Sequence, residues 1–414
     1  MLRKPVEDKF NTIFSYAMKW CVFAVVFAAP FSKSISEIAI SVGIVLFLAR
    51  RIINKDISLP KTGLELPFLI FVATIIPSFF VTAYFGLSLK ALFSKVLKYI
   101  AFYYVIVESI DTEAKLKDLF VIAFLSTIVI LADGFIQLYG PIPDFLHQYP
   151  VYKYRAPNDG AGFFRGFPTA CFPFPNDLAA WILLVIMPIA CVTIFDLKGL
   201  RIRWVVASVS LALFYLLFLT KARGAWVGFA VSCIYIALAK KRFWLIAVLV
   251  VMLVMPFFLR MEMANYIFGI SSVSDRFFMW GTGWEIFKVH PVIGNGLNSF
   301  FQEFMRLRND EWKGKKGAYA HNCYLQMAAD TGLVGLVGFI YLMAAYFVGV
   351  GKSLKKIKDK FYESVLLGLS MGVLAFLVLG FFDTNLYSLN LATLFWSSIG
   401  VSAATAGVRA GRPA

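Results

Sequence analysis

Residues 332–350 read GLVGLVGFIYLMAAYFVGV and contain no charged side chain. A helix needs about 20 mainly apolar residues to cross the hydrocarbon core of a bilayer. Eleven further apolar runs of similar length occur, at 14–31, 35–52, 66–83, 91–107, 118–138, 177–195, 202–219, 224–240, 243–259, 364–382 and 387–406. The sequence therefore predicts an all-α polytopic membrane protein, a single domain over residues 1–414 with about twelve transmembrane helices.

The composition agrees with this fold class. Of the 414 residues, 60% are hydrophobic and 15% are charged, and the mean hydropathy is +0.76, far from the balance of a soluble domain. A net charge of +16 in a soluble chain would suggest nucleic-acid binding. Here most Lys and Arg residues stand in short segments between apolar runs, as they do in cytoplasmic loops. We therefore expect no nucleic-acid partner.

The basic residues also predict the orientation in the membrane. With both termini in the cytoplasm, the cytoplasmic segments hold Arg50, Arg51, Lys115, Lys117 and the lysine-rich run 352–360. The short turns on the other face hold fewer basic residues, so the positive-inside rule favours cytoplasmic termini. The first apolar run lacks a small-residue cleavage site, and we expect it to be a retained span. Two long loops, 139–176 and 260–331, then lie on the outer face.

The loop 260–331 is the longest polar interval and contains two of the three histidines, His290 and His321. His290 opens HPVIGNG, in which proline and two glycines predict a turn, so we interpret it as a structural residue. His321 opens HNCYLQMAADTGLVGLVGF, which leads into the apolar run 332–350. An imidazole at the mouth of a membrane cavity can deprotonate an attacking hydroxyl. A capping or hydrogen-bonding role for His321 is the alternative.

Four basic residues at the outer surface are candidates for binding an anionic substrate. Lys221 and Arg223, in FLTKARGAWVGF, precede a predicted helix, and helix N-termini favour phosphate. Arg276 precedes aromatic residues at spacings of three and four, which predicts a helix with one aromatic face on the membrane (Phe277, Trp280, Trp284 and Phe287). Arg165 lies in the aromatic outer loop 139–176. Contacts to lipid phosphates for Arg223, and plain packing for the loop of Arg165, are the alternatives.

Three further features have weaker interpretations. Asn176 or Asp177 could cap the helix predicted at 177–195. Lys95 and Lys98 lie one turn apart in the run 91–107, where snorkelling to the interface is favoured over a role in substrate binding. The five cysteines are far apart and mostly lie in or beside apolar runs, which indicates neither a disulfide framework nor a metal site.

Three segments together resemble the superfamily of O-antigen ligases and O-antigen polymerases. They are RGAW at Arg223 to Trp226, DRFFMWGTGWEIFKVHPVIGNGLNSF, and AHNCYLQMAADTGLVGLVGF. The patterns R-G-x-W, R-x-x-x-W, H-P-x-x-G-x-G and H-N-x-Y-L in this order are fairly specific for the superfamily. They cover about residues 220–340 and do not separate ligase from polymerase. The resemblance implies a membrane glycosyltransferase of the GT-C type.

The resemblance also implies roles for residues. Arg223 and Arg276 would bind the diphosphate of the donor, and His321 would act as the catalytic base. Lys221 and Arg165 complete the predicted substrate-binding set. The family is metal-independent, and the carboxylates of the loop 260–331 include no D-x-D pair, so we expect no metal and no cofactor.

As an O-antigen ligase, the protein would transfer a preassembled glycan, with inversion, from undecaprenyl diphosphate to the lipid A core oligosaccharide. The transfer would take place on the periplasmic face of the bacterial inner membrane, with membrane lipids as further partners. The alternative in the same class is a polymerase that joins lipid-linked repeat units. A flippase or transporter of lipid-linked glycan is disfavoured, because the predicted spans hold few ionisable groups.

Overall fold

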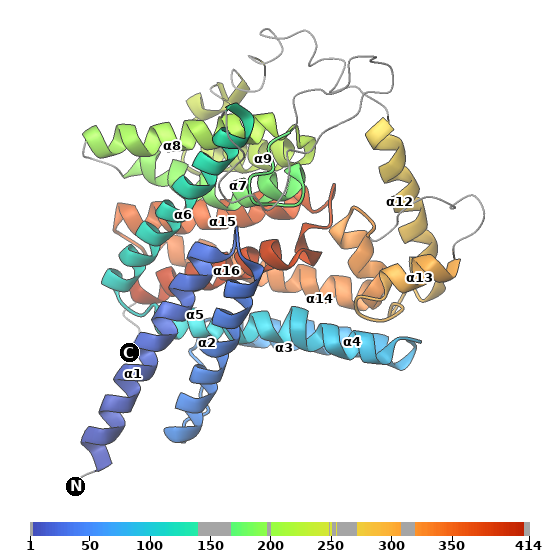
Figure 1. The fold of residues 1–414 in the computed structure, drawn as a ribbon, viewed down its shortest axis with the longest axis horizontal. Coiled ribbons are helices and arrows are strands. Elements are labelled where there is room, and N and C mark those ends of the chain that lie inside the picture. Colours follow the sequence, from blue (N-terminus) through green and yellow to red (C-terminus); the bar gives the residue numbers. More distant parts are fainter. Residues whose placement is uncertain are drawn as a thin grey trace.

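The structure is a computed structural model that describes residues 3–139, 167–196, 200–247, 249–250, 254, 271–307 and 319–409. These residues form α-helices and include no β-strand (Figure 1). The helices are α1 (Arg3–Ala28), α2 (Lys33–Ile53), α3 (Glu65–Ile75), α4 (Phe85–Ala91), α5 (Lys98–Ser109), α6 (Glu113–Tyr139), α7 (Pro175–Phe195), α8 (Leu200–Leu219), α9 (Arg223–Ala239), α12 (Ser271–Val289), α13 (Phe300–Leu307), α14 (Cys323–Leu354), α15 (Lys360–Leu379) and α16 (Leu389–Arg409).

Within the described residues, seven helices are long and apolar enough to cross a membrane: Phe10–Ala28, Glu113–Tyr139, Pro175–Phe195, Arg201–Leu219, Cys323–Leu354, Lys360–Leu379 and Leu389–Val408. Glu65–Phe80 and Arg223–Ala239 are shorter apolar helices. The prediction of an all-helical polytopic membrane protein is thus confirmed. The count of about twelve spans is not confirmed by these helices.

Part of the difference arises where predicted spans are interrupted or lie outside the described residues. The run 66–83 starts as α3 but continues as a 3₁₀ helix over Ile76–Phe80, where Pro77 removes a backbone donor. The run 91–107 is divided by a π-helix over Leu92–Leu97, which separates α4 from α5. The run 243–259 falls largely outside the described residues. Apolar composition therefore identified these segments, but it could not predict the irregular backbone within them.

Helix α15 packs against α7, α9 and α16 at the centre of the bundle. Small residues permit this packing. A Cβ added to Gly368 would lie 2.3 Å from the Pro188 Cα of α7, and one added to Gly228 of α9 would lie 2.4 Å from the Ala375 carbonyl oxygen of α15. Helices in membranes associate through such close backbone approaches, because no hydrophobic effect drives them together there. On the α16 side, Phe376 stacks on Phe395 with ring centroids 5.1 Å apart.

Several helix ends meet at one end of the bundle, which we call the basic end. Arg50 of α2 is paired with Glu108 of α5 at 2.7 Å, and Arg51 contacts the same carboxylate. The last residues of α16 line a cavity of about 390 Å³ together with these arginines. Asn11 of α1 accepts a hydrogen bond from Asn54 at 2.7 Å. The start of α1 and the end of α16 therefore lie at the same end, toward the left of Figure 1.

The opposite end holds the starts of α7, α9 and α14, with α12 and α13 beside them at the right of Figure 1. The predicted outer loop 260–331 is partly helical, since α12, α13 and the first turns of α14 lie within it. Of the second predicted loop, 139–176, residues 140–166 lie outside the described residues. Which end faces the cytoplasm remains a prediction from the distribution of Lys and Arg.

We expect the basic end to face the cytoplasm, because short cytoplasmic segments retain Lys and Arg. Lys358→Cys lies between α14 and α15 at this end, and Lys288→Cys lies on α12, where the side chain is exposed. In intact cells a membrane-impermeant maleimide should label the cysteine at 288 and not the one at 358. Labelling of position 358 without disruption of the inner membrane would contradict the orientation.

Candidate active site

His321 is held at the start of α14. The next residue, Asn322, caps this helix, and its side-chain oxygen accepts hydrogen bonds from the Tyr324 and Leu325 N–H groups, both at 3.0 Å. The carbonyl oxygen of His321 accepts a hydrogen bond of 3.2 Å from the indole nitrogen of Trp280 in α12. The backbone of His321 adopts the left-handed conformation, with φ of +50°. The histidine is thus fixed between α12 and α14.

Asp383 is the partner of the His321 imidazole. The His321 Nδ1 lies 3.2 Å from Asp383 Oδ1, which also accepts a hydrogen bond of 2.8 Å from the Thr384 N–H. The second carboxylate oxygen of Asp383 accepts a hydrogen bond of 2.7 Å from the side-chain amide of Asn176 at the start of α7. The start of α14 is tied to the same region, because the Cys323 N–H donates to the Gly380 carbonyl at 2.7 Å. One carboxylate therefore joins segments that are far apart in the sequence.

The sequence did not identify Asp383 as a functional residue. It belongs to no motif and lies in FFDTN, directly after α15. The available signal was a carboxylate at the outer end of a predicted span.

The prediction that Asn176 or Asp177 caps α7 was wrong: the cap position is Phe174, no side chain caps the helix, and Pro175 occupies its first turn. Asn176 binds Asp383 instead.

The surroundings of Asp383 favour its charged form. Burial alone would raise the pKa of this carboxyl. The hydrogen bond to His321, the Thr384 N–H and the charge of Arg276 oppose that effect, and the pKa lies below its ordinary value. An ionised Asp383 accepts the Nδ1 proton of a neutral imidazole and leaves Nε2 as the basic nitrogen. The His321 side chain is 45% exposed, so a substrate hydroxyl can reach it.

Arg276 lies in α12, one turn before Trp280, and its charge acts on Asp383. The helix predicted from the aromatic spacing is confirmed, but a single aromatic face on the membrane is not. Phe277 and Trp284 are exposed, at 63% and 52%, whereas Phe287 is buried and Trp280 turns toward His321. Two of these aromatic residues, Trp280 and Phe287, therefore pack α12 against the protein, and the other two face outward.

Arg223 begins α9 beside the segment that contains Asp383. A Cβ added to the next residue, Gly224, would lie 2.8 Å from the Phe382 Cβ, so only a glycine allows the start of α9 to lie this close to Asp383. Lys221 precedes α9 with φ of +54°, and its ammonium lies 4.7 Å from the ring centroid of Phe167. Arg165 lies outside the described residues. Arg276 thus acts on Asp383 from α12, and the start of α9, which carries Arg223, lies beside Phe382, the neighbour of Asp383.

The turn HPVIGNG connects α12 to α14 through backbone hydrogen bonds. The N–H groups of Asn295 and Gly296 donate to the carbonyls of Ala329 and Asp330, at 3.1 and 2.8 Å. In return, Leu333 and Val334 donate to the carbonyls of residues 291 and 292, at 2.9 and 3.1 Å. These bonds surround a break in α14 at Gly332, where φ is +69°.

His290 and the two membrane lysines also have partners in the protein. The His290 Nδ1 lies 2.9 Å from the Asn295 side-chain oxygen, inside the turn, in keeping with a structural role. Lys98 is paired with Glu37 of α2 at 2.8 Å. Lys95, in the π-helix, donates to the Asn298 side chain at 2.6 Å. Both lysines are thus bonded within the protein, which the snorkelling interpretation did not include.

Residues 207–340 match the protein family described as O-antigen ligase. This segment contains Arg223, Arg276, His290 and His321, and ends before Asp383. Over this segment, about a third of the chain, the protein is therefore similar to O-antigen ligases. It is also 31% identical, over 111 residues, to the exopolysaccharide production protein ExoQ of Rhizobium meliloti (strain 1021). That similarity spans 26% of this chain and 25% of ExoQ.

The break in α14 predicts a strong effect of one methyl group. In Gly332→Ala, the new Cβ would lie 2.2 Å from the Val292 carbonyl oxygen, on a backbone whose φ suits glycine. We expect a loss of stability of about 1–3 kcal/mol, seen as a lower melting temperature in detergent. Gly349→Ala, in the same helix and with nothing within 4 Å of the new Cβ, should be neutral or slightly stabilising. Equal melting temperatures for the two variants would contradict the proposed constraint.

Proposed function

We propose that this protein is an O-antigen ligase, a membrane glycosyltransferase that transfers a preassembled glycan from undecaprenyl diphosphate to the lipid A core oligosaccharide. The observation that carries the proposal is the His321–Asp383 pair, with Arg276 close enough for its charge to act on Asp383. The match of residues 207–340 to the O-antigen ligase family supports a role in polysaccharide synthesis. The donor, the acceptor, the GT-C type and the periplasmic location of the reaction belong to this proposal.

The proposed reaction is a direct displacement at the anomeric carbon of the donor sugar. The acceptor hydroxyl approaches His321, and its proton passes to Nε2 as the new glycosidic C–O bond forms. The bond between the anomeric carbon and the diphosphate oxygen breaks, and undecaprenyl diphosphate leaves. Asp383 keeps the imidazole in the required tautomer and stabilises the imidazolium that results. A single displacement inverts the anomeric configuration.

Arg223 and Arg276 are proposed to bind the diphosphate. A guanidinium presents a planar set of donors that matches two phosphate oxygens and remains charged at every relevant pH. Its charge stabilises the leaving diphosphate as the anomeric bond breaks, so the mechanism requires no metal ion. Lys221 and Arg165 are proposed to assist in binding the donor. Lys221 lies two residues before Arg223, and this proximity supports its inclusion.

A second candidate function is polymerisation of lipid-linked repeat units. The similarity to a protein named for exopolysaccharide production favours it. The chemistry at His321 would be the same, but the acceptor hydroxyl would belong to a second lipid-linked glycan. Our proposal gives the ligase first place, in line with the description of the matching family.

The two functions predict different products in cells that lack the gene. Loss of a ligase should leave long polymer attached to the polyprenyl carrier, because chain growth continues without transfer. Loss of a polymerase should leave single repeat units on the carrier or on its acceptor. Mass spectrometry of extracted polyprenyl-linked glycans distinguishes these outcomes. An unchanged glycolipid profile would contradict both candidates.

His321→Ala should reduce glycan transfer by about 10²–10⁴-fold, the usual contribution of a positioned base. Asp383→Asn keeps the shape of the side chain but removes its charge, and should also lower turnover because the imidazole loses its orienting carboxylate. The measurement is transfer by purified protein in nanodiscs at saturating donor. Activity of the unaltered protein should fall on acidification, since an imidazolium cannot accept the proton.

His290→Ala is the matched control, because His290 bonds within the HPVIGNG turn. It should lower stability more than turnover per folded molecule.

Arg276→Lys should instead weaken donor binding, since an ammonium cannot form two parallel hydrogen bonds to phosphate. Near-normal turnover in His321→Ala would exclude this histidine as the base.

A further inference from the structure

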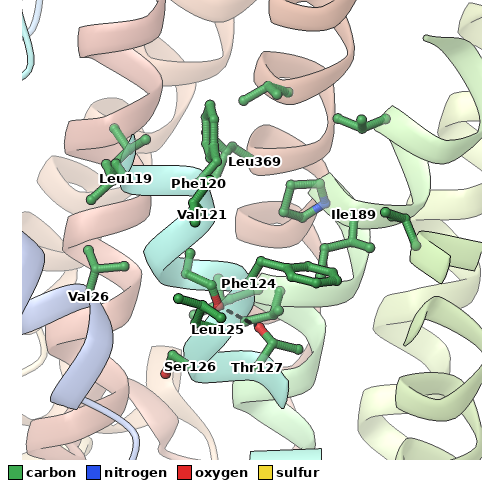
Figure 2. A pocket seen from close by; sticks show the side chains of 18 of the residues that line it. Val26, Leu119, Phe120, Val121, Phe124, Leu125, Ser126, Thr127, Ile189 and Leu369 are labelled. Carbon is green, nitrogen blue, oxygen red and sulfur yellow. Dashed lines mark hydrogen bonds between the residues drawn. The ribbon is translucent and has the colours of Figure 1, made fainter. Parts of the chain in front are cut away.

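A cavity of about 650 Å³ lies between α6, α7, α8 and α15 and opens at the bundle surface, where Val121 and Ile202 of its wall are exposed (Figure 2). Helix α6 packs against α1 and α8, and both of these helices also contribute to the wall of the cavity. Aliphatic and aromatic side chains form most of its wall, among them Leu119, Phe124, Ile189, Val205, Leu369 and Leu394. Its size falls in the range of about 300–1,000 Å³ that is typical of ligand sites.

The few polar groups on this wall are mostly occupied. The Ser126 hydroxyl donates to the Phe27 carbonyl at 2.8 Å, and the Thr127 hydroxyl donates to the Ala123 carbonyl at the same distance. Ser398 donates to the Leu394 carbonyl at 2.9 Å. Among the described hydroxyl groups on the wall, only that of Ser397 lacks a partner. The cavity therefore suits a hydrocarbon ligand.

Two basic residues stand at one end of this wall. Lys117 lies near the start of α6, and Arg201 near the start of α8. Both side chains are exposed, and neither forms an ion pair with a residue in the described part of the chain. The start of α6 belongs to the basic end, because Glu113 accepts a hydrogen bond of 3.2 Å from Tyr362 at the start of α15. Lys117 and Arg201 thus lie at the end opposite His321.

We propose that this cavity binds an anionic phospholipid of the leaflet at the basic end. Its acyl chains fill the space between α6, α7 and α15, and its phosphate lies between Lys117 and Arg201. An unfilled void would deprive the wall of dispersion contacts that the surrounding lipid chains can supply. Basic pockets between transmembrane helices at a cytoplasmic surface attract acidic headgroups. This inference is independent of the proposed glycan transfer.

The polyprenyl tail of the donor is the competing occupant. The donor diphosphate is proposed to lie near Arg223 and Arg276, at the other end of the bundle. A tail entering from there would bring hydrocarbon into the cavity but no anion to Lys117 and Arg201. The uncompensated positive charge at the basic end therefore favours a phospholipid whose headgroup is in the same leaflet.

The test uses photoactivatable phosphatidylglycerol, with a diazirine in the acyl chain, in nanodiscs of phosphatidylcholine that contain the full chain. A phosphatidylcholine with the same diazirine chain is the matched probe. We expect crosslinks to peptides of α6 and α7 that line the cavity, with phosphatidylglycerol favoured. Each basic residue near a membrane surface contributes about five-fold in attraction to an anionic lipid. The double variant Lys117→Gln/Arg201→Gln should thus lose a preference of about five-fold or more.

Arg203→Gln is the control variant, since Arg203 is exposed on α8 but does not line the cavity. It should keep the preference for phosphatidylglycerol. Ala123→Phe, which adds a ring to the cavity wall, should reduce crosslinking by both probes. Two outcomes would overturn the proposal: equal labelling by the two lipids in the unaltered protein, or labelling of these peptides by a photoactivatable polyprenyl diphosphate in preference to phosphatidylglycerol.

Discussion

When a membrane helix is interrupted, backbone N–H and C=O groups at the break lose their partners within the helix. Other protein groups must then form hydrogen bonds with them, because lipid offers none. In α14 the break at Gly332 meets this requirement through the HPVIGNG turn. The turn donates to the carbonyls of Ala329 and Asp330 and accepts from Leu333 and Val334. Since the turn directly follows α12, these four bonds also determine where α12 lies. Arg276 on α12 and His321 at the start of α14 depend on this arrangement.

The sequence predicted the parts of the site that local patterns encode. Apolar runs identified the spans, and aromatic spacing identified α12. The sequence placed His321 in the outer loop before the apolar run 332–350, whereas α14 already begins at Cys323. Pro291, Gly294 and Gly296 indicated a turn, and the two glycines adopt φ of +79° and +117°. These features depend on residues close together in the chain, which sequence reasoning reads directly.

The features that sequence reasoning missed depend on residues far apart. Asp383 is separated from His321 by 62 positions, and nothing in FFDTN indicates that its carboxylate meets an imidazole. Asn176 was interpreted through its neighbours in the chain as a helix cap, although its side chain bonds Asp383 across the bundle. Gly224 likewise matters through its contact with Phe382. Each of these pairings is created by the packing of α7, α9 and α14 around the end of α15.

The location of Asp383 after α15 has a consequence for exchanging parts with other proteins that match the same family model. The segment that matches the family ends at residue 340, whereas the carboxylate that orients His321 stands beyond it. A chimaera that transplants only 207–340 would join the histidine of one protein to the carboxylate loop of another. The boundary at residue 340 would fall inside α14, so the start of α14 and the end of α15, which contact each other, would come from different proteins. The unit to transfer is therefore the segment from the start of α9 through Asn385, whose side chain accepts a hydrogen bond from Cys323.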